Sequence, residues 1–202
     1  MKLQKLISKL EKHHKKKLDL SLGRTFNLLK KLGNPQDKLK NVITVVGTNA
    51  KASMCYSLKS ILNQAGYKTN LYTSPHLLSY TERYVFDDKE INEEDLIELL
   101  TDIEKTLGDD NATLFEILTC AFLKHAENFK DNINIIEAGL FHRFDATNIL
   151  RENLASVVTP ISKDHLDWLE KDQQTIEKIV FEKTSTLLKS NIIVAKQSTK
   201  ET

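Results

Sequence analysis

The stretch from residue 42 to residue 66 limits the possible folds more than any other part of this chain. It opens with Val-Ile-Thr-Val-Val, a run rich in β-branched residues that predicts a buried strand and stops at Gly47. A short polar loop follows, and apolar residues then recur at helical spacing up to Gly66, which is placed to end a helix. Strand, loop and helix in this order predict the start of a β-α-β unit, and therefore a sheet with parallel strands.

The loop of this unit, Gly-Thr-Asn-Ala-Lys-Ala-Ser, is suited to a phosphate group. Lys51 falls at the expected helix N-terminus, where backbone N–H groups point outwards and favour an anion. The hydroxyl of Ser53 is placed to reach a magnesium ion carried by that phosphate. The usual phosphate loop has glycine on both sides of its lysine, whereas this chain has Ala50 and Ala52, and a left-handed alanine costs about 1 to 2 kcal/mol. A polar turn with a solvated lysine is the alternative interpretation of the loop taken alone.

The rest of the chain alternates between strand and helix patterns. Further strands are expected at residues 68–72, 81–86, 132–136, 156–159 and 191–195. Helices are expected at residues 1–17, 20–32, 93–107, 114–129 and 173–188. This alternation predicts an α/β fold with three layers, α/β/α, around a mostly parallel sheet that contains the phosphate-loop β-α-β unit.

The composition is that of an ordinary globular chain. Hydrophobic residues make up 40% and charged residues 28% of the 202 positions, which suits one domain with extensions. The net charge of +1 gives no reason to expect nucleic acid or a membrane surface as a partner. Cys55 and Cys120 fall among apolar residues of expected helices, which favours buried free thiols in a reducing compartment. The sequence has no apolar run of membrane-spanning length and no signal-peptide core, so we expect a cytoplasmic protein.

Three polar residues lie just beyond the ends of expected strands: Ser74, Glu137 and His165. The carboxyl ends of parallel strands meet at one sheet edge, where α/β proteins bind ligands, so these side chains are expected on the side of Lys51. Hydroxyl, carboxylate and imidazole groups are suitable metal ligands. Three separately hydrogen-bonded loop residues are the alternative. For His76 taken alone, a capping or hydrogen-bonding role is favoured over a ligand role.

Short sequence runs along nearly the whole chain resemble one family. The matching runs are residues 18–24, 32–39, 47–53, 65–67, 72–77, 82–83, 115–116, 145–148, 164–165 and 182–183. In this order and spacing they are similar to the N-terminal half of the folylpolyglutamate synthase / dihydrofolate synthase family, a member of the Mur ligase superfamily. The resemblance implies a helical substrate-side extension at residues 1–40 and an incomplete, truncated Mur-ligase-type central ATP-binding domain at residues 41–202. The C-terminal glutamate-binding domain of the family would be absent.

The resemblance implies an ATP-dependent ligation of a carboxylate to an amine. A dihydropteroate or folate carboxylate would attack the γ-phosphate of ATP to give an acyl phosphate, which the amine of L-glutamate then displaces. ATP and Mg2+ are the implied cofactors, and a complementing C-terminal polypeptide is a candidate partner. The alternatives are a truncated, catalytically impaired homologue that binds folate or nucleotide or needs a partner chain, and a generic phosphate-loop hydrolase.

The resemblance also assigns roles to individual residues. It implies catalytic roles for Lys51, Lys183 and His165, with Lys183 carbamylated so that it helps to hold a second metal ion. The ATP phosphates would be held by the loop residues Thr48, Asn49, Ala50, Lys51, Ala52 and Ser53. The metal ions would be held by Ser74, Glu137 and His165. The substrate-binding residues would be His14, His76, Arg83, Thr113, Phe115, Glu116, Phe144, Asp145 and Ala146.

The chain departs from the family pattern outside the phosphate loop as well. Where the family has Gly-Leu-Gly-Gly-Arg-Leu-Asp-Ala-Thr-Asn, this chain has Phe141, His142 and Phe144, which place bulky side chains near the implied pterin site. Where the family has Glu-Lys-Ala-Gly, this chain has Thr184 and Ser185. A sheet edge left exposed by truncation is expected to aggregate or to bind a partner.

Overall fold

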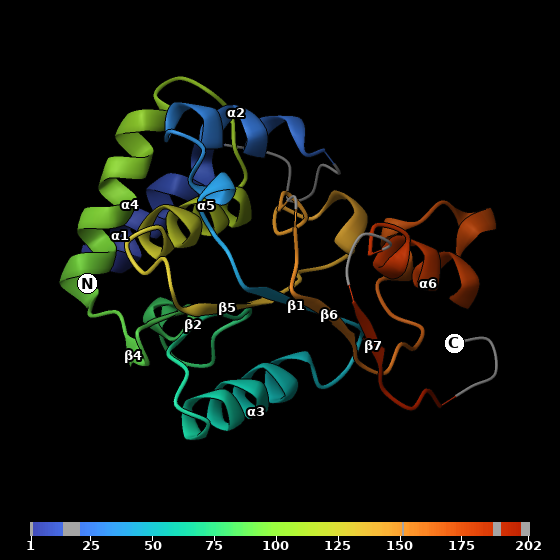
Figure 1. Ribbon diagram of the computed structural model, residues 1–202. Coiled ribbons are helices and arrows are strands. Elements are labelled where there is room, and N and C mark those ends of the chain that lie inside the picture. Colours follow the sequence, from blue (N-terminus) through green and yellow to red (C-terminus); the bar gives the residue numbers. More distant parts are fainter. Residues whose placement is uncertain (1, 14–20, 151, 188–190, 199–202) are drawn as a thin grey trace.

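The computed structural model describes residues 2–13, 21–150, 152–187 and 191–198. Within this part of the chain, seven strands form one sheet in the order β4-β3-β2-β5-β1-β6-β7 (Figure 1). The strands are β1 (Val42–Val46), β2 (Thr69–Tyr72), β3 (Tyr84–Phe86), β4 (Lys89–Glu90), β5 (Ile133–Glu137), β6 (Ala155–Val158) and β7 (Ile192–Val194). Strands β2, β5, β1, β6 and β7 run parallel, and β3 and β4 pair antiparallel at one end. The predicted mostly parallel sheet is confirmed.

The central parallel strands end level with one another. Tyr72 of β2 pairs with Ile136 of β5, and Val45 of β1 pairs with Glu137 on one side and Val157 on the other. The loops that leave β2, β5, β1 and β6 therefore start from one edge of the sheet, as the sequence pattern predicts. This edge carries most of the candidate functional residues.

Helices cover both faces of the sheet. They are α1 (Lys2–Leu10), α2 (Gly23–Lys31), α3 (Lys51–Gln64), α4 (Glu93–Leu107), α5 (Leu114–Ala126) and α6 (Ile176–Thr184). In Figure 1, α3 lies below the sheet and α1, α2, α4 and α5 lie above it. This arrangement confirms the predicted three layers, and β1, α3 and the parallel strand β2 form the predicted β-α-β unit.

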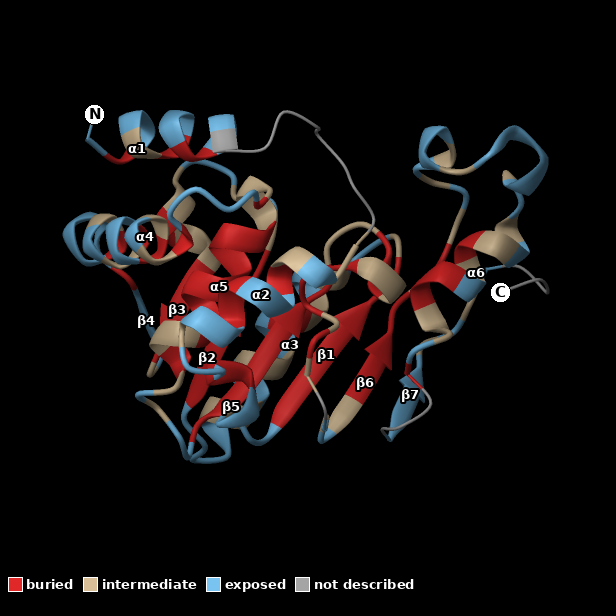
Figure 2. Ribbon diagram, turned by 90° about the horizontal axis from the view of Figure 1, so that it is seen from above, coloured by how far each residue is buried: buried red, intermediate tan, exposed pale blue. Residues whose placement is uncertain are grey.

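Two apolar layers hold α1–α5 on the sheet, because successive residues of a strand face opposite sides, and a third cluster that includes Ile179 holds α6. In β1, Val42 contacts the layer under α1, α2, α4 and α5, whereas Ile43 faces α3. The first layer contains stacked aromatic rings, with the Phe122 centroid 5.0 Å from that of Tyr72 and 5.3 Å from that of Phe86. Figure 2 shows the consequence: the central strands and α5 are mostly buried, while α1 and α4 are buried along one side only.

Some element boundaries differ from those predicted. Residues 81–83, expected within a strand, lie in a 3₁₀ turn because Ser79 and Glu82 form a capping box there. The helix expected at residues 173–188 begins only at Ile176, because the side chain of Thr175 caps it. The helix expected at residues 1–17 ends at Leu10 and is followed by a 3₁₀ turn (Glu11–His13), and its last four residues lie outside the described part.

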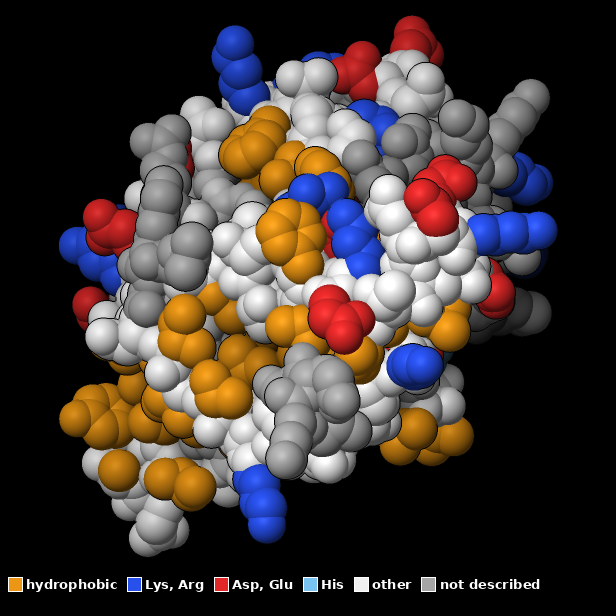
Figure 3. Space-filling view, turned by 90° about the vertical axis from the view of Figure 1, so that its right-hand side faces the viewer, with side chains coloured by type: hydrophobic (Ala, Val, Ile, Leu, Met, Phe, Trp, Pro, Cys, Tyr) orange, Lys and Arg blue, Asp and Glu red, His pale blue; other side chains and the backbone are white. Residues whose placement is uncertain are grey.

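Strand β7 forms one edge of the sheet. Its side chains Ile192, Ile193 and Val194 are 43%, 58% and 59% exposed, and within the described chain no strand pairs with its outer side. Figure 3 faces this side of the molecule and shows hydrophobic side chains gathered on it. The expected exposed edge is therefore present, whereas a partner for it stays a prediction. No helix among the described residues has the length and apolar character needed to cross a membrane.

Candidate functional site

The loop between β1 and α3 is held against the loop that follows β6. Gly47 has a φ of 143°, and a Cβ atom there would lie 2.9 Å from the carbonyl oxygen of Thr159, so the close approach requires glycine. The N–H groups of Thr48 and Asn49 both donate to the carbonyl oxygen of Pro160 over 3.1 Å. These contacts bring the ends of β1 and β6 together.

The first turn of α3 has features that favour an anion. Ala50 is left-handed, with φ 62° and ψ 16°, so the strain predicted for this loop is present at Ala50, while Ala52 lies inside α3. Alanine has no side-chain oxygen to cap the first-turn N–H groups, so these donors receive no cap from this side chain. The Lys51 Nζ atom lies 3.4 Å from the carbonyl oxygen of Thr48, a long hydrogen bond that keeps the ammonium group over the loop. A helix N-terminus and a cation together favour a phosphate.

A buried carboxylate lies at the end of β5. Glu137 is 3% exposed, and its Oε2 atom accepts a 3.0 Å hydrogen bond from the N–H of Ser74. Burial raises the pKa of Glu137, and this hydrogen bond and the charges of Lys51 and Arg83 oppose the rise. The structure therefore brings together two of the three predicted metal-binding residues.

His165 does not contact that pair directly. It has a φ of 53°, and its Nε2 atom lies 3.1 Å from Oδ2 of Asp164. Burial lowers the pKa of His165, the charge of Asp164 opposes this, and the charges of Lys183 and Lys51 add to it. Among the described residues, no three His, Cys, Asp or Glu side chains are grouped so that they could hold a metal ion. The metal site that joins His165 to Glu137 stays a prediction.

Lys183 is a buried lysine beside the same edge. It is 2% exposed, and its Nζ atom donates a 2.8 Å hydrogen bond to the carbonyl oxygen of Leu140. Burial lowers the pKa of Lys183 to about 8, and the charge of Lys51 contributes in the same direction. The residue pattern alone would place a lysine at the surface. The missed signal is spacing, because Lys183 lies four residues from each of the buried residues Ile179 and Leu187.

Asp145 closes the loop that follows β5. Its Oδ1 atom accepts hydrogen bonds from the N–H and the hydroxyl of Thr147, at 3.0 and 2.5 Å, and its Oδ2 atom accepts one from the N–H of Leu140 at 3.1 Å. A Cβ atom on Gly139 would lie 2.9 Å from the ring of Phe115 and closer still to Asp145. Two residues predicted to bind substrate, Asp145 and Phe115, therefore meet across Gly139.

Other residues predicted to bind substrate lie near the start of α5 and in the same loop. Thr113 and Glu116 form the capping box of α5, and Arg24 donates to both carboxylate oxygens of Glu116, at 2.9 and 3.1 Å. Ala146 is buried and Phe144 is half-buried in the loop after β5. Substrate binding by these residues stays a prediction.

His76 and Arg83 meet in the segment after β2. The Nε atom of Arg83 donates to Nδ1 of His76 over 2.9 Å, and the ring of His76 lies 4.1 Å from that of Tyr80 between centroids. Burial and the charge of Arg83 lower the pKa of His76. His76 thus makes a hydrogen bond as expected, and substrate binding by His76 and Arg83 stays a prediction. His14 lies outside the described residues.

Comparison with known proteins decides the family. No family model matches the chain. It is 41% identical over 170 residues to the dihydrofolate synthase/folylpolyglutamate synthase of Escherichia coli (strain K12), an alignment that covers 84% of this chain and 40% of that protein. A protein of the same name from Bacillus subtilis (strain 168) is 36% identical over 173 residues, covering 82% and 39%. Over its matched length, the chain belongs with the N-terminal part of the folylpolyglutamate synthase and dihydrofolate synthase family.

Solved synthase structures share this fold. E. coli FolC in complex with DHPP and ADP superposes with a TM-score of 0.82 at 39% identity, covering 90% of this chain and 42% of that one. The bifunctional synthase of Yersinia pestis complexed with AMPPNP and Mn ion gives a TM-score of 0.81 at 34% identity, covering 91% and 44%. The chain spans about 40% of the length of the curated synthases it matches, and the matched portion is N-terminal, as the resemblance predicts.

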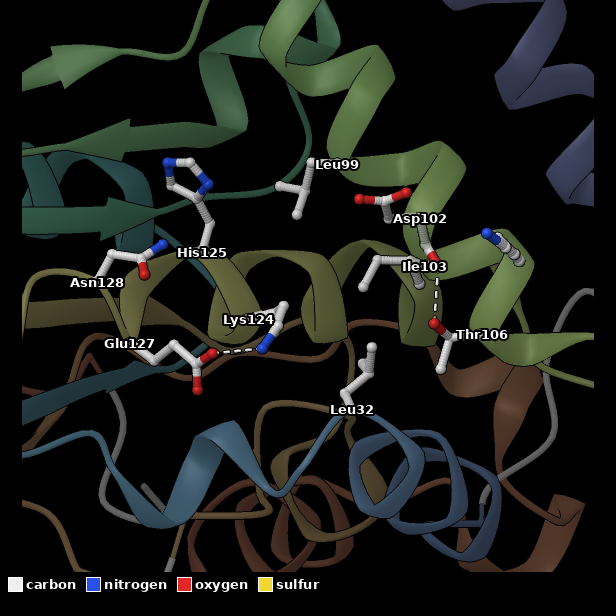
Figure 4. Close-up of a pocket in the computed structure, with 10 residues that line it drawn as sticks. Leu32, Leu99, Asp102, Ile103, Thr106, Lys124, His125, Glu127 and Asn128 are labelled. Atoms are coloured by element: carbon white, nitrogen blue, oxygen red, sulfur yellow. Dashed lines mark hydrogen bonds and ion pairs between the residues drawn. The ribbon is translucent and has the colours of Figure 1, made fainter.

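The structure also has a pocket that lies away from the predicted site residues. It has a volume of about 580 Å³, lies along α4 and the C-terminal part of α5, and includes Leu32 and Ile103 (Figure 4). None of the predicted site residues lines it, and two of its charged residues, Lys124 and Glu127, form an ion pair with each other. We therefore place the candidate site at the carboxyl edge of the sheet.

Proposed function

We propose that the chain is the nucleotide-binding part of an ATP-dependent carboxylate-amine ligase of the folylpolyglutamate and dihydrofolate synthase type. The observation that carries this proposal is the position of Lys51 at the start of α3, where its charge acts on the pKa of both Glu137 and Lys183. The Lys51 ammonium group, the buried Glu137 carboxylate and the buried Lys183 amine are thus close enough to influence one another electrostatically. The named relatives are synthases, which favours a ligase over a generic phosphate-loop hydrolase.

The proposed reaction has two steps. A carboxylate oxygen of dihydropteroate or folate attacks the γ-phosphorus of ATP, the new P–O bond forms, and the bond to the departing ADP breaks. The amine of L-glutamate then attacks the acyl carbon, an amide forms, and inorganic phosphate leaves. Both steps depend on positioning and on neutralising phosphate charge, for which the Lys51 ammonium group and the first-turn N–H groups of α3 are placed.

The chemistry of these residues fits magnesium. Mg2+ prefers oxygen ligands, and the Glu137 carboxylate is buried and benefits from a compensating cation. In our proposal Ser74 holds one Mg2+ ion, and Glu137, His165 and carbamylated Lys183 hold a second. When bound, magnesium would neutralise charge on the phosphates. The lowered pKa of Lys183 supports carbamylation because only the neutral amine adds to carbon dioxide.

The substrates are proposed to occupy two places. The pterin-linked carboxylate substrate would lie against the start of α5, at residues 113–116, and the loop residues 144–146, because Phe115 and Asp145 come together at Gly139. L-Glutamate would bind to a part of the ligase outside the length matched here. A complementing C-terminal polypeptide, continuous or separate, would supply that part.

The first experiment is a thermal melt of the chain with and without millimolar MgATP. Ligand at about 100 times its Kd stabilises a protein by about 2.7 kcal/mol, which corresponds to a rise in Tm of several degrees for a chain of this size. We expect a rise that EDTA reduces and that Lys51→Met abolishes. A cooperative melt of the unaltered chain with no change in Tm would contradict nucleotide binding. If the Tm rises with MgATP, a glutamate-ligation assay, with and without the C-terminal part of a relative, would test the reaction.

A further inference from the structure

Arg143 connects the loop after β5 to helix α6. Its Nε atom lies 2.8 Å from Oε2 of Glu182, a carboxylate whose side chain is only 4% exposed. The guanidinium carbon lies 4.3 Å from the ring centroid of Phe144 and 5.2 Å from that of Phe181. A planar guanidinium group that contacts two aromatic rings and pairs with a buried carboxylate has little freedom to move.

A second contact joins the same two elements. Lys183 follows Glu182 in α6, and its Nζ atom donates to the carbonyl oxygen of Leu140, three residues before Arg143. The loop and the helix are therefore joined twice, once by Arg143 to Glu182 and once by Lys183 to Leu140. Glu182 and Lys183 are adjacent in α6, and Leu140 and Arg143 lie three residues apart in the loop, so loss of the first contact is expected to loosen the second.

We propose that Arg143 is a positioning residue for Lys183. Its pair with Glu182 holds α6 against the loop, so that the Lys183 amine stays buried and directed at Leu140. The inference can be tested by ADP binding and by acetylation of Lys183. The ADP-binding test rests on the proposed function, in which Lys183 helps to hold a metal ion. The acetylation test does not depend on nucleotide binding.

Lys178 provides a matched control. Its Nζ atom lies 3.0 Å from Oε1 of the same Glu182 and 5.1 Å from the ring centroid of the same Phe181. Lys178 belongs to α6 itself, four residues before Glu182, so this pair stays within one helix and cannot fasten the helix to the loop. Removing Lys178 takes away a similar charge and a similar ring contact without removing the connection.

The test compares Arg143→Met with Lys178→Met, since methionine preserves apolar contact with Phe181. Each variant of the full 202-residue chain is treated briefly with acetic anhydride at one fixed pH, and acetylation of Lys183 is measured by peptide mass spectrometry. We expect labelling of Lys183 to rise at least about fivefold in Arg143→Met and to stay within about twofold of wild type in Lys178→Met. Equal labelling in the two variants would overturn the proposal.

Arg143→Lys is the second variant, which keeps the charge and loses the planar group. Labelling of Lys183 between the values for wild type and Arg143→Met is expected. If Arg143→Met gives no cooperative melt, Arg143→Lys decides the matter: labelling above wild type supports the proposal, and labelling equal to wild type overturns it.

The Kd for ADP, measured with and without Mn2+, distinguishes positioning of Lys183 from a general structural role of Arg143. In Arg143→Met we expect the Kd for ADP to rise about tenfold in the presence of Mn2+ and to stay unchanged in EDTA, while Lys178→Met matches wild type in both. An equal loss with and without Mn2+ would overturn the positioning role. If the wild-type chain binds no ADP, the proposed function fails, and the labelling experiment still tests Arg143 separately.

Discussion

The N–H of Ser74 donates a 3.0 Å hydrogen bond to Oε2 of Glu137 and joins the ends of the neighbouring parallel strands β2 and β5. The carboxylate is 3% exposed, so this bond is part of what makes its burial tolerable. This buried pair leads to a pH-dependent prediction.

Glu137→Gln should stabilise the chain increasingly as the pH rises. Because burial raises the pKa of Glu137, the folded chain holds the carboxyl proton more tightly than the unfolded chain. That stabilisation is complete below the unfolded pKa and is lost as the pH rises through the higher folded value, whereas glutamine does not titrate. Urea unfolding from about pH 4 to pH 7.5 should show a difference that grows in favour of the variant. A difference independent of pH would contradict this account.

Ala50→Gly should stabilise the chain by about 0.5 to 1 kcal/mol, or roughly 1 to 4 °C in Tm. The reason is the left-handed backbone of Ala50, which glycine adopts without a steric cost, partly offset by the greater entropy of unfolded glycine. Ala52→Gly is the control. Ala52 lies inside α3, so glycine there should lower stability by about 0.5 to 1 kcal/mol. An Ala50→Gly variant that is no more stable than the unaltered chain would contradict strain at Ala50.

Lys183→Met should alter the alkaline limb of the stability curve. The pKa of Lys183 is lowered to about 8 by burial, so the folded chain disfavours the proton that the unfolded chain keeps up to higher pH. Wild type should therefore gain stability relative to the variant between about pH 8 and pH 10.5, by the order of 3 kcal/mol. Chemical denaturation of both chains at about pH 7 and pH 10 measures this difference. Parallel curves would mean that Lys183 titrates as an ordinary surface lysine.

Ile193→Lys should reduce self-association of the chain. Ile193 is 58% exposed in β7, whose outer side pairs with no other described strand, and a charge on an edge strand hinders edge-to-edge pairing. Stability should change by no more than about 0.5 kcal/mol because the side chain is largely solvated. Sedimentation velocity of both chains provides the measurement. A wild-type chain that is already monomeric and binds no dye specific for exposed apolar surface would remove the basis for this prediction.

Much of the fold follows from local pattern. The pattern of residues 42–64 places β1 and the following helix α3 correctly, because strand and helix periodicities are properties of neighbouring residues. The same kind of pattern places the loops after β2, β5 and β6 at one edge. The turn at residues 80–83 was missed because its capping box, Ser79 with Glu82, outweighs the strand propensity of the residues between.

The candidate site divides in the same way. The sequence by itself determined which loops carry Lys51, Ser74 and Glu137, since the carboxyl ends of parallel strands lie at one edge of a sheet. Only the tertiary structure decided that Lys183 is buried against Leu140 and that Arg143 pairs with Glu182. Those contacts join residues about 40 positions apart, and their formation depends on how α6 packs on the loop. Periodicity records which side of an element is apolar, whereas packing decides which distant partner that side meets.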